Sequence, residues 1–288
     1  MNDKLWKMAA LLLAGGLVAG DAVAGDVAIM PSMLELAVDP GGDVTKVVQI
    51  HYGKDGPDDT RPIRVMLGVE NWTMNSVGDV SFSAADARWS AKPWIVFSPS
   101  EAEIRPGEIM TVRVSVIVPE DTEGGEYRAA LIAQPRMPFV AMEQGERRLE
   151  LVCRLAAILY VEVPPVLGDV ELGALQVTQL AGRWHAVPRF HNPGNRHLRV
   201  LDSFEILPLA DPPTLVTCDR EEQEAGVILP GQSRQFLHPL PCDLPPGWYR
   251  LLYRADVGAN LPIQEGETTF VIAPSRGETI ASAEAPAP

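Results

Sequence analysis

Ile104-Arg105-Pro106-Gly107, followed by Gly124-Gly125-Glu126-Tyr127-Arg128, is the stretch that decides the fold, because the chain repeats it. The second copy reads Leu229-Pro230-Gly231 and then Pro246-Gly247-Trp248-Tyr249-Arg250. In each copy a Pro-Gly turn precedes a strand-like stretch, and a Gly-x-Tyr-Arg step begins its return partner. A tyrosine near the start of a late strand, after a corner, is typical of immunoglobulin-like sandwiches. Because one such sandwich needs about 100 residues, the repeat predicts two of them in tandem.

The regions between these landmarks favour strands throughout. Residues Met110 to Val118 alternate strictly, with valines at every second position, and Val44 to Tyr52 and Arg64 to Val69 show a similar pattern. No stretch keeps the 3.6-residue apolar period of a helix. We therefore expect an all-β fold of two tandem immunoglobulin-like sandwiches with little helix.

The N-terminus has the pattern of a secretory signal peptide. Lys4 and Lys7 precede a short apolar run from Met8 to Gly20, and Ala22-Val23-Ala24 fits the small-x-small cleavage pattern. Residues 1–24 are thus expected to be removed, which leaves an exported, periplasmic chain with no membrane span. Val163-Pro164-Pro165 is stiff enough to be a linker. The predicted domains are 25–163 and 164–273, and the Ala/Pro-rich tail 274–288 is expected to be disordered.

Charge and cysteine content limit the partners. A net charge of −14 in 288 residues argues against nucleic acid and against anionic membranes. Cys218 and Cys242 flank one strand–turn–strand stretch and are expected to form a disulfide in an oxidising compartment. Cys153 would be left over as a small apolar side chain.

No catalytic constellation is visible, so we expect no enzyme activity, no cofactor and no metal. His185, His191 and His197 are spaced six residues apart, but no nearby carboxylate or thiolate completes a metal site, which favours surface histidines. Trp72, Trp89 and Trp94 could stack on a sugar, but packing in and around a sandwich core is the preferred interpretation. An enzyme or carbohydrate-binding protein built on these residues is the least favoured hypothesis.

The long apolar stretch from Arg148 to Val163 is the most informative candidate site. Side chains of a strand alternate between its two faces, and here both faces are mostly apolar. One face has Leu149, Leu151, Cys153, Leu155 and Ala157, and the other has Val152, Arg154, Ala156 and Ile158. The last strand of a domain tends to lie at a sheet edge, where another chain can pair with it. A central strand covered on both faces is the alternative.

Several residues resemble the PapD-like family of periplasmic pilus-assembly chaperones. The matching features cover most of residues 25–273: Pro31 leading to Leu34, Leu36 and Pro40-Gly41; Trp94 to Phe97 with Ser98-Pro99; Ile104-x-Pro106-Gly107; Tyr127-Arg128-Ala129; and the long apolar strand before a proline hinge. The resemblance implies donor-strand complementation, in which the last strand of the first domain is lent to a pilin-like subunit. The family also has a basic anchor pair, an Arg in the first strand and a Lys in the last.

This chain departs from that anchor, because Val27 to Leu36 has no Arg or Lys, and the last strand offers Arg154, with Arg147 and Arg148 at its entrance, but no Lys. The leading hypothesis is a non-enzymatic chaperone that binds secreted pilin-like or immunoglobulin-like subunits. Its expected partner-binding strand has Leu149, Leu151, Cys153, Arg154, Leu155 and Ala157. A structural or adhesive cell-surface module without strand donation is the alternative, and a homodimer formed through the same strand is a further expectation.

Overall fold

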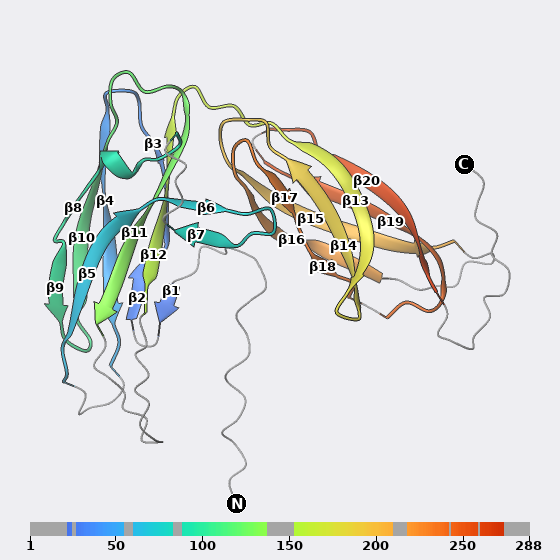
Figure 1. Ribbon diagram of the computed structural model, residues 1–288, viewed down its shortest axis with the longest axis horizontal. Helices are drawn as coiled ribbons and strands as arrows, with labels where there is room; N and C mark the ends of the chain where they lie inside the picture. Colours follow the sequence, from blue (N-terminus) through green and yellow to red (C-terminus); the bar gives the residue numbers. More distant parts are fainter. Residues whose placement is uncertain are drawn as a thin grey trace, which may run out of the picture.

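The computed structural model describes residues 22–24, 27–54, 60–82, 88–136, 153–209, 218–241, 243–258 and 260–273. They form two β-sandwiches side by side, joined at one end by the segment after strand β12 (Figure 1). Within these ranges the one helical element is the 3-10 turn η1 (Lys92–Trp94). The predicted fold class, all-β with two tandem sandwiches, is confirmed.

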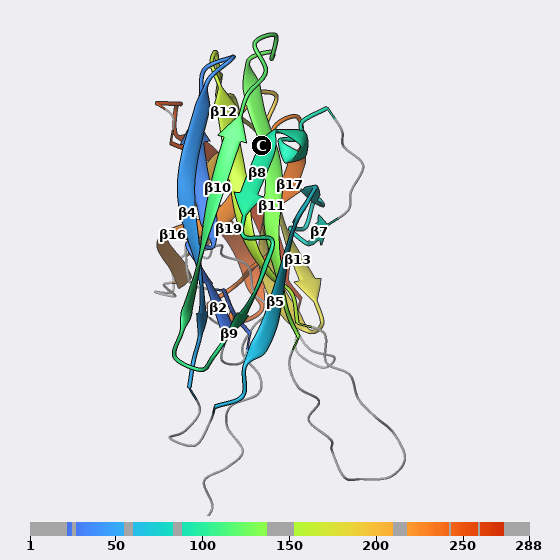
Figure 2. The same cartoon turned by 90° about the vertical axis from the view of Figure 1, so that its left-hand side faces the viewer.

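The N-terminal sandwich has two five-stranded sheets, and Figure 2 looks onto it with the C-terminal sandwich behind. One sheet has the order β1-β2-β4-β10-β8, and the other has the order β3-β12-β11-β5-β9. Their bounds are β1 Ala22–Ala24, β2 Val27–Met30, β4 Asp43–Tyr52, β10 Ile109–Ile117 and β8 Ile95–Ser98, then β3 Met33–Ala37, β12 Leu155–Val163, β11 Gly125–Arg136, β5 Ile63–Glu70 and β9 Glu101–Ile104.

The valine alternation of β10 produces the sandwich directly. Val112, Val114 and Val116 are buried between the sheets, while the alternating residues Thr111 and Arg113 are exposed. A pleated strand places alternate side chains on opposite faces, so this pattern fixes which face packs on the core. The partner strand β4 buries Val48 and Ile50 in the same core.

The C-terminal sandwich consists of two four-stranded sheets. One has the order β13-β14-β17 with β18 also paired to β14, and the other has the order β16-β15-β19-β20. Their bounds are β13 Glu171–Leu180, β14 Arg183–His191, β17 Ser233–Gln235 and β18 His238–Pro239, then β16 Cys218–Ile228, β15 Leu198–Pro208, β19 Gly247–Asp256 and β20 Gln264–Ile272. Phe190, Phe204 and Tyr253 fill the core between them.

The two copies of the repeated phrase have matching geometry. Gly107 and Gly231 both have a left-handed backbone, with φ of 87° and 67°, which only glycine adopts without strain. Tyr127 donates its hydroxyl hydrogen bond to the Glu123 carbonyl at 3.0 Å, and Tyr249 donates to the Pro245 carbonyl at 2.8 Å. Each sandwich therefore has the tyrosine corner that the sequence pattern indicates.

A separate hairpin leaves the N-terminal sandwich. It consists of β6 (Trp72–Met74) and β7 (Val80–Phe82), which pair only with each other. Figure 1 shows it reaching from the end of β5 toward β16 and β17 of the C-terminal sandwich. The sequence pattern gives no indication of this contact with the other domain.

Some predictions lie outside the described residues. These are the signal residues 1–21, the tail 274–288 and Cys242, so the Cys218–Cys242 disulfide stays a prediction. The two main apolar cores end at Val163 and begin at Val170, on either side of Pro164-Pro165, and the domain limits themselves stay predictions. Within the described ranges no helix is long and apolar enough to cross a membrane.

Candidate functional site: the outer edge of strand β12 and the domain interface

Strand β12 has a pairing partner on only one side at its N-terminal end. β11 pairs with the whole strand, from Leu155 opposite Ala133 to Val163 opposite Gly125. β3 runs parallel to the other side but pairs only with Ile158–Glu162. In the part of the chain that the structure describes, no strand pairs with residues 155–157 on their outer side. The sheet edge expected from the sequence is therefore present over this short segment only.

The backbone direction at this edge follows from one hydrogen bond. The Ile158 amide donates to the Ser32 carbonyl at 2.8 Å, so it points away from β11. Successive amides of a strand point to opposite sides, so amides two residues apart point to the same side. The Ala156 amide therefore points to the outer edge, as the Ile158 amide does. β1 and β2 lie near this end of β12 without pairing with it (Figure 1).

The side chains of β12 are largely used inside the molecule. Leu155, Ala157 and Leu159 are buried in the core of the N-terminal sandwich. Ile158 and Tyr160 on the opposite face are buried against the C-terminal sandwich. The backbone edge, more than an apolar face, is thus what β12 presents to a partner in this conformation.

The predicted partner-binding residues are distributed unevenly. Leu149 and Leu151 lie outside the described residues, and β12 begins at Leu155, so Cys153 and Arg154 precede the strand instead of lying within it. Cys153 is partly buried against the core, and this burial raises the pKa of its thiol. Arg154 is exposed, with its guanidinium 2.5 Å from the Glu70 carboxylate. Its charge is thus paired within its own sandwich.

A third apolar cluster, which we call the interface cluster, joins the two sandwiches. Its buried members are Trp72, Met74, Ala130, Ile132, Ile158, Tyr160, Val227 and Leu229. Trp72 donates its indole hydrogen bond to the Ala129 carbonyl at 3.1 Å, and its ring packs edge-on against Tyr160 at 5.5 Å between centroids. Apolar burial of this kind is the main favourable term in domain association.

The β6–β7 hairpin also contacts the C-terminal sandwich through polar groups. The Gln235 amide donates to the Ser76 carbonyl at 2.8 Å, between the hairpin turn and β17. The turn residue Gly78, at φ 99°, lies over the guanidinium of Arg234, and a Cβ there would come within 2.0 Å of its nitrogens. Burial lowers the pKa of the Arg234 guanidinium, and the negative charge of Asp79 partly offsets this shift. The hairpin thus covers the interface from the side of the N-terminal sandwich.

Ion pairs link the domains beside the interface cluster. Arg199 of β15 lies 2.5 Å from Glu35 of β3, and Arg196 lies 2.8 Å from Glu162 of β12. Burial would by itself raise the pKa of the Glu35 carboxyl. The hydrogen bond from Arg199 and the positive charge of Arg199, with a contribution from His197, instead hold this pKa below its ordinary value. These pairs cross from one sandwich to the other, so they help fix the angle between them.

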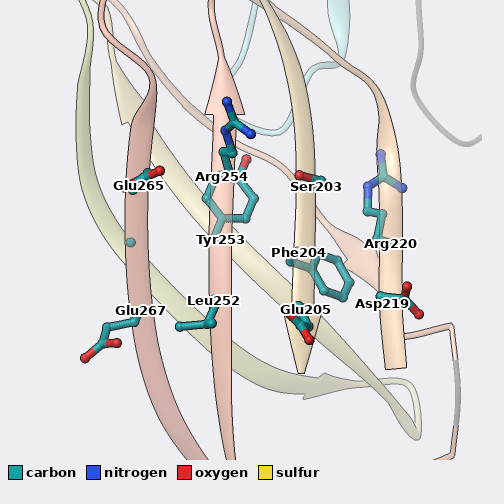
Figure 3. A pocket seen from close by; sticks show the side chains of 11 residues that line it. Ser203, Phe204, Glu205, Asp219, Arg220, Leu252, Tyr253, Arg254, Glu265 and Glu267 are labelled. Atoms are coloured by element: carbon teal, nitrogen blue, oxygen red, sulfur yellow. The ribbon is translucent and has the colours of Figure 1, made fainter. Parts of the chain in front are cut away.

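The outer sheet of the C-terminal sandwich carries a shallow depression of about 780 Å³ (Figure 3). Ser203, Arg254 and Glu265 lie at one end and Leu252 and Glu267 at the other. Asp202, fully buried, accepts hydrogen bonds from Tyr253 at 2.6 Å and from Arg220 at 3.2 Å. The described residues that line the depression thus mix positive and negative charges on an open sheet face.

The chain has distant structural likenesses but no sequence match. No family model matches it, and no curated protein matches it. A solved chaperone–tip adhesin complex of CFA/I fimbriae biogenesis is 11% identical, with a TM-score of 0.43, covering 86% of this chain and 100% of that one. The CsuC–CsuE chaperone–tip adhesion subunit complex from Acinetobacter baumannii is 12% identical, with a TM-score of 0.43, covering 82% and 96%. The Salmonella enterica SafA pilin–SafB chaperone complex is 11% identical, with a TM-score of 0.41, covering 87% and 98%.

The aromatic and histidine residues singled out from the sequence take different places. Trp72 is buried in the interface cluster, and Trp89 and Trp94 pack around Tyr127, so packing describes them better than a sugar-stacking surface. His185 and His191 lie on β14. His197 is buried, which corrects the expectation of a surface histidine.

Sequence reasoning missed the buried polar contact between the domains. Glu126 is fully buried and contacts His197 of the other sandwich. The repeat contained a signal for it, because Glu126 occupies the place that Trp248 holds in the second copy. A carboxylate at a position otherwise suited to an aromatic side chain indicates a specific polar partner.

Proposed function

We propose that this chain is a periplasmic, non-enzymatic chaperone that binds pilin-like or immunoglobulin-like subunits by strand addition to β12. The observation that carries the proposal is the outer edge of residues 155–157, where no described strand pairs. An extended segment of another chain can add to such an edge, with main-chain hydrogen bonds providing affinity and alternate side chains providing specificity. The sequence from Leu149 to Val152, which is apolar apart from Glu150 and precedes this edge, would extend the pairing surface.

The family resemblance of the sequence motifs supports the same activity. It implies that the lent strand is the last of the first domain, and β12 is that strand. The missing basic pair distinguishes this chain, since Arg154 is already paired with Glu70. Affinity for a subunit would therefore depend on backbone pairing and apolar burial, worth about 25 cal/mol per Å² of apolar surface, more than on a charged anchor.

The test removes one hydrogen-bond donor from the edge. Ala156→Pro deletes the outward amide while leaving the amides that face β11 in place, and proline is tolerated where a strand's N–H faces away from its sheet. Ala156→Ser is the matched control, because it keeps the amide and changes the side chain only slightly. The tagged protein is purified from the periplasm of its own cells, and intact complexes are weighed by mass spectrometry.

A one-to-one complex with a small secreted β-rich subunit is expected for the parent and for Ala156→Ser. Loss of that complex in a folded Ala156→Pro protein supports strand addition. A complex that persists in Ala156→Pro contradicts it, and so does a parent protein recovered only as a monomer.

A structural two-domain module of the cell surface is the second candidate. The interface cluster favours it, because the apolar face of β12 at Ile158 and Tyr160 is already covered by the C-terminal sandwich. Recovery of the parent protein in an outer-surface fraction without any bound subunit is the result expected for such a module. A homodimer in the same experiment would indicate that the β12 edge pairs with a second copy.

A further inference from the structure

Three potential metal ligands meet where the two sandwiches join. Glu126 of β11 and Glu162 of β12 are register partners on neighbouring strands of the N-terminal sandwich. His197 lies immediately before β15 in the C-terminal sandwich. One ligand atom from each of the three lies within 4.8 Å of the others. The third ligand of this set therefore comes from a different domain, 71 residues along the chain from Glu126.

Burial makes this cluster unlike a surface group of acids. Glu126 is fully buried, and His197 is 6% exposed. The Glu126 Oε2 atom accepts a hydrogen bond from the His197 backbone amide at 3.0 Å and also contacts its Nδ1. The other oxygen, Oε1, is buried and has no hydrogen-bond partner among the described residues. A buried carboxylate oxygen without a partner is costly, so this atom is suited to binding a cation.

The carboxylates at Glu126 and Glu162 also repel each other. Like charges directly opposite on neighbouring strands destabilise a sheet. Arg196 offsets this at Glu162, with its guanidinium 2.8 Å from Oε1. A divalent cation between the two carboxylates would remove the repulsion more completely, and Arg196 would compete with it for Glu162.

The surroundings of the His197 ring match those of a metal-binding imidazole. A ligating histidine commonly directs its second ring nitrogen at a carboxylate, which orients the ring. Here Nδ1 faces Glu126, and Nε2 lies 3.5 Å from the Glu35 carboxylate. Arg199 holds Glu35 at 2.5 Å, and the Tyr160 ring stacks on the imidazole at 4.2 Å between centroids. The ring is thus held from three sides.

We propose that Glu126, Glu162 and His197 form a divalent transition-metal site, with zinc the ion that fits best, across the domain interface. One imidazole nitrogen and two carboxylates are a donor set that zinc accepts at about 2.0–2.2 Å, with water completing the tetrahedron. Such a site would tie β11 and β12 to the start of β15. It does not depend on the proposed chaperone function. The competing explanation is a plain ion pair between Glu126 and protonated His197.

Zinc binding to the whole purified protein separates the two explanations. The protein carries no histidine tag, is treated with EDTA and dialysed, and is then titrated with zinc sulfate by calorimetry. Cobalt(II) replaces zinc in a parallel titration, because its visible absorption reports tetrahedral coordination. We expect one zinc per chain and a cobalt spectrum with nitrogen and oxygen ligands.

Two variants and a control locate the site. Glu162→Gln keeps the Glu126–His197 contact and is expected to weaken zinc at least tenfold, and His197→Gln is expected to abolish binding. Glu70→Gln is the matched control, because Glu70 is also partly exposed and pairs with an arginine, Arg154, that has no contact with the cluster among the described residues. It is expected to bind zinc within twofold of the parent.

The proposal is overturned if the parent binds no zinc at micromolar concentration, since the cluster is then an ion pair alone. It is also overturned if the zinc affinity of Glu162→Gln equals that of the parent, because the ion would then occupy another site. Should His197→Gln fail to fold, the Glu162→Gln titration still decides between the two explanations.

Discussion

The interface cluster makes a prediction about Leu229, which belongs to the C-terminal sandwich but packs on the N-terminal one. Leu229 is 2% exposed and shares the cluster with Ile132 and Tyr160 of the first sandwich. Replacing a buried leucine by alanine costs about 2–5 kcal/mol, from the lost transfer free energy and the cavity left behind. An interface can partly close around the gap, so we expect Leu229→Ala to fall near the lower end, about 2–3 kcal/mol.

The informative result is where in the molecule that loss is observed. Leu229→Ala removes apolar contacts from both sandwiches, so it should destabilise both. Leu251→Ala is the matched control, because Leu251 is fully buried in the core of the C-terminal sandwich alone. Native-state hydrogen exchange measures the difference residue by residue.

With Leu229→Ala, we expect faster exchange of the Ala130, Ile132 and Tyr160 amides as well as those of β15 and β19. With Leu251→Ala, only the C-terminal strands should exchange faster. If Leu229→Ala leaves the N-terminal amides unchanged, the two sandwiches are not energetically coupled through this cluster, and the reasoning is refuted.

Three further perturbations test the corners, an ion pair and a thiol. Tyr127→Phe and Tyr249→Phe each remove a hydrogen bond to the carbonyl four residues earlier, and each should lower the free energy of unfolding in urea by about 0.5–1.5 kcal/mol; unchanged midpoints would show that the corners contribute nothing. The pKa of Glu35 is lowered in the folded protein, so its pairing with Arg199 should stabilise the fold above the ordinary pKa of 4.5 and lose that contribution as pH falls below it. Since Glu35 is half exposed, this decrease in the free energy of unfolding should stay below about 1 kcal/mol, and Glu35→Gln should unfold without this part of the pH dependence. If Glu35→Gln has the same acid unfolding profile as the parent, the pairing does not contribute. Burial raises the pKa of the Cys153 thiol, so iodoacetamide at pH 8 should modify Cys153 more slowly in the native protein than in urea. Equal rates would show that this thiol is not shielded by the fold.

Local pattern was sufficient to predict the two sandwiches. Alternation in β10 identified its buried valines, and the repeated Pro-Gly and Tyr landmarks located a left-handed turn and a tyrosine corner in each domain. These features depend on residues close together in sequence. The strand after the loop was also predicted, although its described part starts at Leu155 instead of Arg148.

The domain interface could not be predicted in the same way, because its contacts join distant segments. Nothing near His197 in sequence indicates Glu126, and periodicity alone cannot show that Trp72 packs against Tyr160. Both faces of β12 are apolar for two separate reasons, the sandwich core on one side and the interface cluster on the other. The sequence pattern of a donated strand and that of a strand covered on both faces are therefore the same.

The interface cluster has a consequence for the order in which the chain is made. Residues up to Val163 complete the N-terminal sandwich before Val227 and Leu229 have been added. Until then Trp72, Ile132 and Tyr160 lie on a bare apolar surface of the kind that promotes aggregation. The two sandwiches are thus not interchangeable modules. A chain truncated at Pro164 is expected to expose the N-terminal part of the interface cluster and to aggregate, and the C-terminal sandwich protects that surface once it is made.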